Sequence, residues 1–305
     1  MSDNTDLPST YPHPVRLAII GGTGIASLTH SGFTPVAVLN PTTPWGSPSS
    51  PITILHTPHT THPIAFLARH GAYHQFLPSE VPNQANIAAL RSIGVRSVIA
   101  FSAVGSLREE IKPRDFVVPD QVFDRTKGVR PWTYFGGGVV GHVGFAEPFD
   151  HRLSQVVAGV GEKVLGQRGG RLHMGGTLIC MEGPQFSTRA ESHIYRSSIP
   201  NAAIINMSCL PESKLAREAE LAYIMICMST DYDCWKSDEE PVTVETVMGN
   251  MKANAETANA LVSAVLEELV KEEHAELVAA NHLSGATRWS VCTKEGFFGS
   301  DFRSL

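Results

Sequence analysis

Short apolar runs alternate with helical patterns along almost the whole chain, and this alternation constrains the fold more than any other feature. Runs rich in branched or aromatic residues are typical of buried strands. They occupy residues 15–20, 52–55, 64–68, 98–101, 116–118, 178–181, 203–206 and 223–228. Because strands and helices alternate, the sequence predicts an α/β layered fold.

The helical patterns lie between these runs and after the last one. Residues 83–93 carry apolar side chains at helical spacing, and residues 212–222 mix charge and alanine after a proline. Thr188 and Glu191 have the spacing of a capping box, which predicts that a helix begins there. A long amphipathic helix is expected over residues 244–269.

The length of 305 residues fits one large domain. We place that domain at residues 15–280. Residues 1–14 are expected to form a flexible tail, and residues 281–305 a tail of uncertain order.

Charge, hydropathy and cysteine usage exclude several classes of protein. A net charge of -6 with scattered Lys and Arg gives no attraction for nucleic acid or an anionic membrane. No apolar run is long enough to span a bilayer, and the first residues lack a secretory signal. The five spaced cysteines indicate reduced thiols. We therefore expect a cytoplasmic location, with the nucleus as the alternative.

Three histidines, His56, His59 and His62, recur at every third position. Such spacing would indicate a metal site if the side chains lay on one face. The intervening prolines and threonines favour an irregular turn instead, so no metal ligand set is expected.

A glycine loop, Gly21-Gly22-Thr23-Gly24, follows the first predicted strand. Glycines let backbone amides approach an anion closely, and the Thr23 hydroxyl adds a donor, so the loop is a candidate phosphate cradle. It lacks the spacing of a dinucleotide fingerprint or a P-loop. A strand-to-helix turn without a ligand explains the loop equally well.

Two further segments carry polar groups at strand ends. Arg69 and His70 follow one predicted strand, where a guanidinium and an imidazole suit phosphate oxygens. The alternative is a surface arginine beside a packed histidine. Ser102 and Ala103 end another predicted strand, at the carboxyl end where ligands of α/β proteins collect, and a simple turn is the equal competitor.

Asp231 and Asp233 come just after the most apolar predicted strand. Carboxylates at such a point either face a pocket or cap a helix. The following Cys234-Trp235 is an unusual helix opening, so the pocket is favoured.

These segments together resemble one family over nearly the whole chain, the trimeric purine nucleoside phosphorylases, and within them the methylthioadenosine phosphorylases. The matching blocks occur in family order. They include Leu67-Ala68-Arg69-His70-Gly71, Met181-Glu182-Gly183-Pro184, Ile205-Asn206-Met207 and Thr230-Asp231-Tyr232-Asp233-Cys234-Trp235.

The resemblance implies a single-domain three-layer fold with a mixed, partly barrel-like central sheet flanked by helices. It also implies a homotrimer that uses inorganic phosphate as cosubstrate, needs no cofactor, and serves purine and methionine salvage. The implied phosphate ligands are Thr23, Arg69, His70, Ser102, Ala103 and Ser208. The implied substrate-binding residues are Phe186, Ser187, Met207, Asp231, Tyr232, Asp233, Val244 and Val247, with His74 and His142 closing the pocket of a neighbouring subunit.

The implied reaction is phosphorolysis, in which phosphate attacks the anomeric carbon while the bond to the purine breaks. Asp231 and Asp233 are the implied catalytic residues, because a carboxyl group can donate a proton to the departing base. Members of the family that act on 6-oxopurines carry asparagine in place of Asp231 and glutamate in place of Ser187. The chain has the adenine-type pair.

Three alternatives stay open at this stage. A phosphorylase for 6-oxopurine nucleosides or methylthioinosine would need a protonated Asp231. A Rossmann protein would need a ribose-binding acid about twenty residues beyond the glycine loop, and residues 40–48 offer none. A silent scaffold would have lost the phosphate ligands, all of which are present.

Ser102 and Ser208 stand where animal members usually carry threonine, and the match is poor after Asn281.

Overall fold

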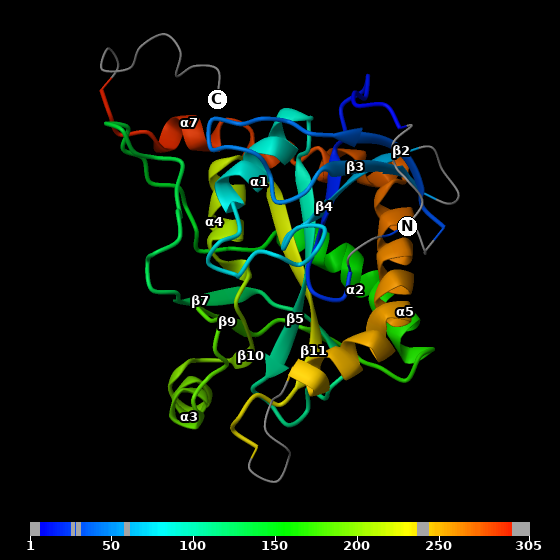
Figure 1. Cartoon of the computed structure of the whole chain (residues 1–305), viewed down its shortest axis with the longest axis vertical. Coiled ribbons are helices and arrows are strands. Elements are labelled where there is room, and N and C mark those ends of the chain that lie inside the picture. The colour runs from blue at the N-terminus through cyan, green and yellow to red at the C-terminus, as the bar shows by residue number, and fades with distance from the viewer. Residues whose placement is uncertain (1–6, 26–27, 29–31, 58–61, 237–243, 295–305) are drawn as a thin grey trace.

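The computed structural model describes residues 7–25, 28, 32–57, 62–236 and 244–294. Within these residues, eleven strands form one mixed sheet with helices on both faces, which confirms the predicted α/β class (Figure 1). The strands are β1 (Leu17–Gly21), β2 (Thr34–Leu39), β3 (Ile52–His56), β4 (Pro63–Ala68), β5 (Ser97–Ser106), β6 (Phe116–Val118), β7 (Gln121–Arg125), β8 (Leu172–Met174), β9 (Thr177–Met181), β10 (Ala202–Asn206) and β11 (Ala222–Asp231).

The helices cover the chain between and after these strands. They are α1 (Asn83–Ser92), α2 (His151–Gly166), α3 (Arg189–Ser198), α4 (Cys209–Glu218), α5 (Val244–Leu269), α6 (Ala275–Val278) and α7 (Ala286–Ser290), with the 3-10 turns η3 (Glu272–His274) and η4 (Asn281–Leu283). None of the helices among the described residues combines the length and hydropathy needed to cross a membrane.

The sheet branches at β5. The main path runs β2-β3-β4-β1-β5-β10-β9-β7, while β11 pairs with both β5 and β6, and β8 pairs with β6. The strands β4, β1, β5 and β11 are mutually parallel. Parallel neighbours bring their carboxyl ends to the same edge of a sheet, which gathers the residues that follow them.

Two apolar layers sandwich the central strands, and successive residues of one strand point into different layers. In β5, Val98 and Ala100 pack on the side of α1 and α4, whereas Ile99 and Phe101 pack on the side of α2 and α5. Strands buried on both faces read as continuous apolar runs rather than alternating ones, which is why the sequence revealed them.

Both central strands extend beyond their predicted ends. The runs 98–101 and 223–228 predicted the apolar parts of β5 and β11, but the parallel ladder continues with Cys227 opposite Ser102 and Met228 opposite Ala103. Ser102 and Ala103 therefore lie inside β5, so the prediction that they end the strand was wrong. Asp231 is the last residue of β11.

Some elements were not predicted. Strands β2, β7 and β8 carry few buried residues, and helix α2 contains glycines that lower helix propensity. The range of α4 starts at Cys209, but Leu210 has non-helical backbone angles (φ -112°, ψ 136°), so the regular part of the helix begins close to the predicted start at Glu212. After α5, Thr287 in α7 donates from its backbone and hydroxyl to Glu220 and Glu218, so residues 281–294 contact the body of the fold.

The predicted helix start at Thr188 is confirmed by the capping box of α3. The Thr188 hydroxyl oxygen accepts from the Glu191 backbone N–H at 3.2 Å, and the Glu191 carboxylate accepts from the Thr188 backbone N–H at 2.9 Å.

Replacement of Thr188 by alanine should lower the free energy of unfolding by about 1 kcal/mol, because one helix N–H loses its acceptor. Urea unfolding of Thr188→Ala measures this change. His193→Ala, at an exposed position of the same helix, serves as the control. Equal stability of the two variants would contradict the capping role.

Candidate active site

The predicted phosphate residues come from the segments after β1, β4 and β10 and from within β5. Gly22 is the point of closest approach, since a Cβ atom built on it would lie 2.6 Å from Arg69 Nη1 and 2.4 Å from the Phe101 carbonyl oxygen. The Arg69 backbone N–H donates to Gly21 at 2.9 Å. The glycine loop therefore lies directly against Arg69, and its glycines allow this contact.

Ser102 and Ser208 join the same region through Asn206. The buried Asn206 amide donates to Ser102 Oγ at 3.1 Å, and Asn206 Oδ1 accepts from the Ser208 backbone N–H at 3.4 Å. Ser208 is the N-cap residue of α4, yet its side chain makes no capping hydrogen bond. Its hydroxyl is therefore not used by the helix. Ala103 follows Ser102 in β5, and Thr23 lies in the glycine loop.

The guanidinium of Arg69 is buried and bound on three sides. Nε and Nη2 donate to the two carboxylate oxygens of Glu212 at 2.7 and 2.8 Å, and Nη1 donates to the Phe101 carbonyl at 2.7 Å. An arginine has five N–H groups, so one on Nη1 and one on Nη2 are not used in these bonds. Arg69 is thus not the surface residue of the alternative interpretation, and its bidentate face points to Glu212.

His70 is a neutral imidazole. Its Nδ1 lies 2.9 Å from the Phe76 carbonyl, which can only accept, so Nδ1 carries the proton. Burial, followed by the charge of Arg69, lowers the pKa of His70 to about 4. The ring stacks on His74 at a centroid distance of 4.7 Å. At neutral pH, Nε2 of His70 is therefore an acceptor.

Asp231 and Asp233 form a buried acidic pair at the end of β11. Asp231 Oδ2 accepts from the Thr230 hydroxyl and Oδ1 from the Asp233 backbone N–H, both at 2.7 Å. Burial raises the pKa of Asp231 to about 6, although the hydrogen bonds from Thr230 and Asp233 oppose this rise. Burial also raises the pKa of Asp233, whose Oδ2 has no hydrogen-bond partner among the described residues.

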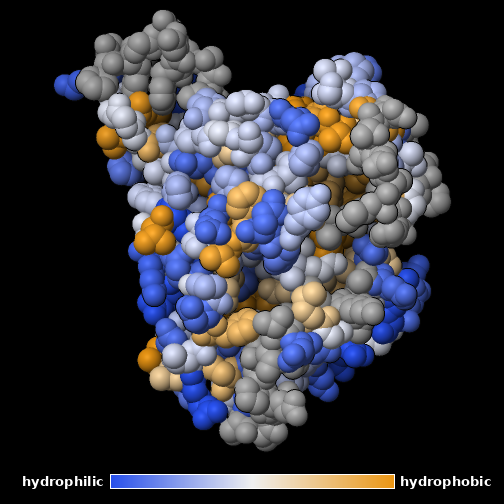
Figure 2. Space-filling model, viewed as in Figure 1, coloured by the Kyte–Doolittle hydropathy of each residue, from blue (hydrophilic) through white to orange (hydrophobic). Residues whose placement is uncertain are grey.

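Two of the remaining predicted substrate residues, Ser187 and Tyr232, lie beside that acidic pair. Ser187 is tied to the segment after Asp233, because Cys234 Sγ donates to its carbonyl at 3.2 Å. The Tyr232 hydroxyl donates to the Glu109 carbonyl at 3.3 Å. Phe186 is 44% exposed, the exposure expected of a residue that contacts a ligand rather than the core. Figure 2 shows a hollow near the centre of the face seen in Figure 1.

Met207 lies against a glycine of the neighbouring loop. A Cβ atom on Gly183, whose φ is +70°, would lie 2.3 Å from Met207 Sδ. Any side chain at Gly183 would displace Met207. The contact between these two residues joins the segment after β9 to the segment before α4.

Three predicted residues are not placed at this site. His142 is exposed, and its backbone N–H donates to Ser290, so it lies beside the C-terminal segment instead. Val244 and Val247 belong to the first turns of α5, and their side chains lie outside the described residues.

A second buried ion pair, Arg130 with Glu182, was not predicted. Arg130 uses all five N–H groups, because Nε donates to the Glu182 carboxylate at 2.6 Å and the others donate to the carbonyls of Met181, Glu182, Met207 and Leu210. It therefore holds together the two segments that carry Ser187 and Met207. Glu212 and Tyr223 were also missed as site residues, since nothing in their local sequence distinguishes them.

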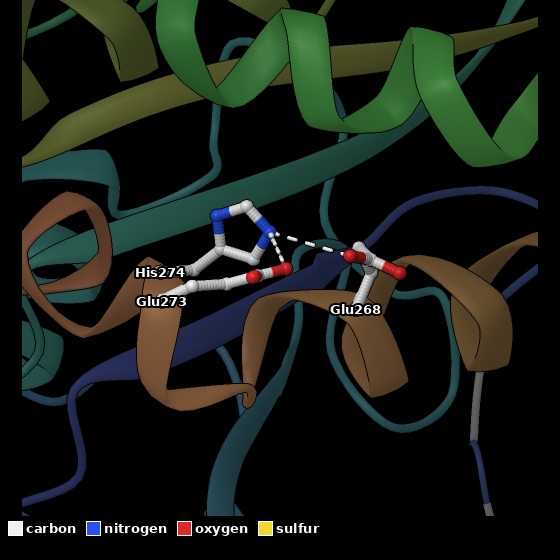
Figure 3. A group of neighbouring side chains, drawn as sticks. All are labelled: Glu268, Glu273 and His274. Atoms are coloured by element: carbon white, nitrogen blue, oxygen red, sulfur yellow. Dashed lines mark hydrogen bonds and ion pairs between the residues drawn. The ribbon is translucent and has the colours of Figure 1, made fainter.

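One group of side chains at the end of α5 has ligand atoms close enough for a metal ion. Glu268, Glu273 and His274 place these atoms within 4.8 Å of one another. Figure 3 shows His274 directed at both carboxylates, with Nε2 at 3.3 Å from Glu268 and 3.6 Å from Glu273. Ion pairing on the surface accounts for this arrangement, so we assign no function to the group.

Comparisons with known proteins show the family of the chain. The family model described as the phosphorylase superfamily matches residues 16–267. An S-methyl-5'-thioadenosine phosphorylase from Tuber melanosporum is 63% identical over 94% of this chain and 92% of its own length. The chain therefore belongs to the phosphorylase superfamily, and within it to the S-methyl-5'-thioadenosine phosphorylases.

Solved structures resemble the fold closely. A crystal structure of a methylthioadenosine phosphorylase from an antarctic soil metagenomic library has a TM-score of 0.82 and 36% identity, covering 96% of this chain and 97% of that one. A methylthioadenosine phosphorylase from Schistosoma mansoni in complex with adenine has a TM-score of 0.80 and 32% identity, covering 90% of this chain and 98% of that one.

The raised pKa of Asp231 predicts a pH-dependent stability. Between the ordinary value of 3.8 and about 6, the folded protein binds a proton that the unfolded chain has released. The contribution of Asp231 to the free energy of unfolding is therefore largest below pH 3.8 and is lost as the pH rises through about 6, by at most ~1.4 kcal/mol per pH unit.

Asp231→Asn removes this titration. Urea unfolding of both proteins from pH 4 to 7 should show the parent losing stability relative to the variant as the pH rises. A stability difference that does not vary with pH would show that Asp231 has an ordinary pKa.

Proposed function

We propose that this chain catalyses the phosphorolysis of S-methyl-5'-thioadenosine to adenine and 5-methylthioribose-1-phosphate. The observation that carries the proposal is Asp231, a buried carboxyl whose pKa of about 6 suits it to exchange a proton near neutral pH. The family assignment supplies the reaction class, and relatives carrying the name of this activity align over nearly the whole chain.

The phosphate side of the proposed site consists of hydrogen-bond donors and one acceptor, Nε2 of the neutral His70, which can bind a protonated phosphate oxygen. Its members are Thr23, Arg69, His70, Ser102, Ala103 and Ser208. Close packing of the glycine loop on Arg69 and the links through Asn206 support the grouping. Donors that are already oriented need no rearrangement when an anion binds, and such preorganisation is a major source of catalysis.

The purine side is formed by Asp231 and Asp233, with Phe186, Ser187, Met207 and Tyr232 around the nucleoside. As phosphate oxygen bonds to the anomeric carbon, the bond from that carbon to the purine breaks and its electron pair moves onto the base. A proton from the Asp231 carboxyl to the imidazole nitrogen relieves this charge. Burial raises the pKa of Asp231 to about 6, which brings the protonated form within reach near neutral pH.

Phosphorolysis of 6-oxopurine nucleosides or methylthioinosine is not favoured. The aligned relatives and the similar solved structures are named for methylthioadenosine. A carboxylate at Asp231 can accept a hydrogen bond from an exocyclic amine, whereas a 6-oxo group in its place would face the carboxylate oxygen without a donor between them.

Assembly, cofactors and location belong to the proposal as well. We propose a homotrimer in which His142 of each subunit reaches the neighbour's site, consistent with its exposed position beside the C-terminal segment. Val244 and Val247 border the alkylthio group, and His74, like His142, closes the pocket of the neighbouring subunit. The reaction needs phosphate and no metal or organic cofactor. A cytoplasmic location, with the nucleus as the alternative, fits the expected substrate.

An assay of base release tests the reaction and its substrate class. Purified protein is incubated with methylthioadenosine, adenosine or inosine, each with and without phosphate. We expect phosphate-dependent release of adenine, fastest from methylthioadenosine. Preference for inosine would move the protein to the 6-oxopurine class, and base release independent of phosphate would refute phosphorolysis.

Ser208→Ala tests the phosphate assignment without harming the fold. Because the Ser208 hydroxyl does not cap α4, its loss should change the free energy of unfolding by less than about 0.5 kcal/mol. The loss of one anion donor should raise the phosphate KM by about tenfold while leaving the nucleoside KM nearly unchanged. A parental phosphate KM would remove Ser208 from the site.

A further inference from the structure

The buried pair of Glu212 and Tyr223 lies behind the guanidinium of Arg69. We propose that Glu212, held by Tyr223, is a positioning residue that fixes the orientation of Arg69 for phosphate binding. This inference rests on the proposed function, because it assigns a role within the phosphate site. Neither residue belongs to the set of phosphate ligands, and both would act through Arg69.

The contacts leave the guanidinium little freedom. Glu212 is fully buried and Arg69 is 1% exposed, and the two parallel bonds between them align the planes of the carboxylate and the guanidinium. The Phe101 carbonyl holds the third nitrogen at 2.7 Å. Rotation of the arginine side chain would break these bonds where no water replaces them, so one orientation is strongly preferred.

Tyr223 orients Glu212 in turn. Its hydroxyl donates to Glu212 Oε1 at 2.7 Å, the oxygen that also accepts from Arg69 Nη2. Burial and the neighbouring charge of Glu212 raise the pKa of Tyr223, so the hydroxyl keeps its proton. The ring stacks on Phe149 at a centroid distance of 6.2 Å, which fixes the position of the hydroxyl.

Glu212 also affects the net charge of the phosphate side of the site. Glu212 balances the charge of Arg69, and His70 beside it is neutral. Phosphate must then be bound by N–H and O–H groups that are correctly directed, rather than by a net positive charge. The two remaining N–H groups of Arg69 contribute only if the guanidinium plane is correct, and Glu212 sets that plane.

A purely structural role for this network is the competing explanation. Arg69 follows β4, Glu212 belongs to α4 and Tyr223 to β11, so the same bonds connect three elements. A structural role lowers stability and the amount of active enzyme without altering the affinity for one substrate. A positioning role changes the phosphate KM selectively.

The experiment compares two conservative variants of the full-length protein, each with a matched control variant. Glu212→Gln keeps the size of the side chain but places an NH2 group against an arginine N–H, and Tyr223→Phe keeps the ring and removes only the hydroxyl. Glu218→Gln is the control on the same helix, since Glu218 binds Thr133 and Tyr134 instead. Tyr134→Phe is the control for the tyrosine, because its hydroxyl donates to Gln84 at the same 2.7 Å.

Steady-state kinetics with phosphate and methylthioadenosine varied separately provide the readout. We expect the phosphate KM to rise by at least about tenfold in Glu212→Gln and about threefold in Tyr223→Phe, with the nucleoside KM within about twofold of the parent. Stabilisation against heat by inorganic phosphate should weaken in the same order. Both control variants should retain the parental phosphate KM.

The outcomes separate this inference from the proposed function. An active parent whose Tyr223→Phe variant keeps the parental phosphate KM would overturn the positioning role, and this variant decides the question if Glu212→Gln does not fold. Equal rises in the KM of both substrates would also overturn it. A parent without phosphate-dependent activity would instead refute the proposed function.

Discussion

The parallel ladder between β5 and β11 is the constraint on which the site depends. Its register is continuous from Ala222 opposite Ser97 to Ser229 opposite Val104, and after a one-residue irregularity at Thr230 the ladder ends with Asp231 opposite Gly105. In the continuous part both strands are covered on both faces, and the two apolar layers exclude a slip by one residue, which would turn each side chain to the opposite face. The ladder therefore fixes Ser102 of the phosphate side relative to Asp231 of the purine side, through the core rather than through surface loops.

Ionic groups buried beside this ladder carry a cost that hydrogen bonding must offset. Burial of Arg69 or Arg130 without a partner would be strongly unfavourable. Glu212 pairs with Arg69 and Glu182 pairs with Arg130, and backbone carbonyls accept further hydrogen bonds from both arginines. Such pairs add little net stability compared with an apolar core. Their value lies in geometry, because each holds a loop that a purely apolar contact would leave less well defined. Arg130 holds the Met207 segment in place, and Glu212 holds Arg69.

The sequence predicted the fold where local composition reflects burial. The runs that became β1, β4, β5 and β11 are apolar because both faces of each strand are covered. The ends of β5 and β11 were not predictable from local sequence. Ser102 belongs to β5 only because it pairs with β11, and Ser229 belongs to β11 only because it pairs with β5. Strand β7 is mostly exposed and has no apolar run, whereas α2 is capped by the Asp150 side chain and carries Leu153, Val157 and Leu165 at helical spacing, a pattern that its glycines weaken.

Some residues of the candidate site likewise carried a signal in their local sequence, and others did not. Arg69, His70, Asp231 and Asp233 were found because polar groups directly after apolar strands are unusual, Thr23 was found from the glycine loop, and family resemblance added Ser208. Glu212 carried no such signal, since a glutamate in a charged helical pattern resembles any solvated residue. Its partner Arg69 is 143 positions away in the sequence, and only the fold brings them together.

The phosphate side and the purine side of the site differ in their electrostatics. On the phosphate side, Glu212 and a neutral His70 keep the net charge low, so that binding depends on the direction of donors. On the purine side, burial favours the protonated form of Asp231, while the Thr230 hydroxyl and the Asp233 N–H favour the ionised form. The result is a pKa near 6, within reach of a proton transfer at neutral pH. Without those two donors burial would hold the proton too firmly, and without burial the carboxyl would have no proton to give.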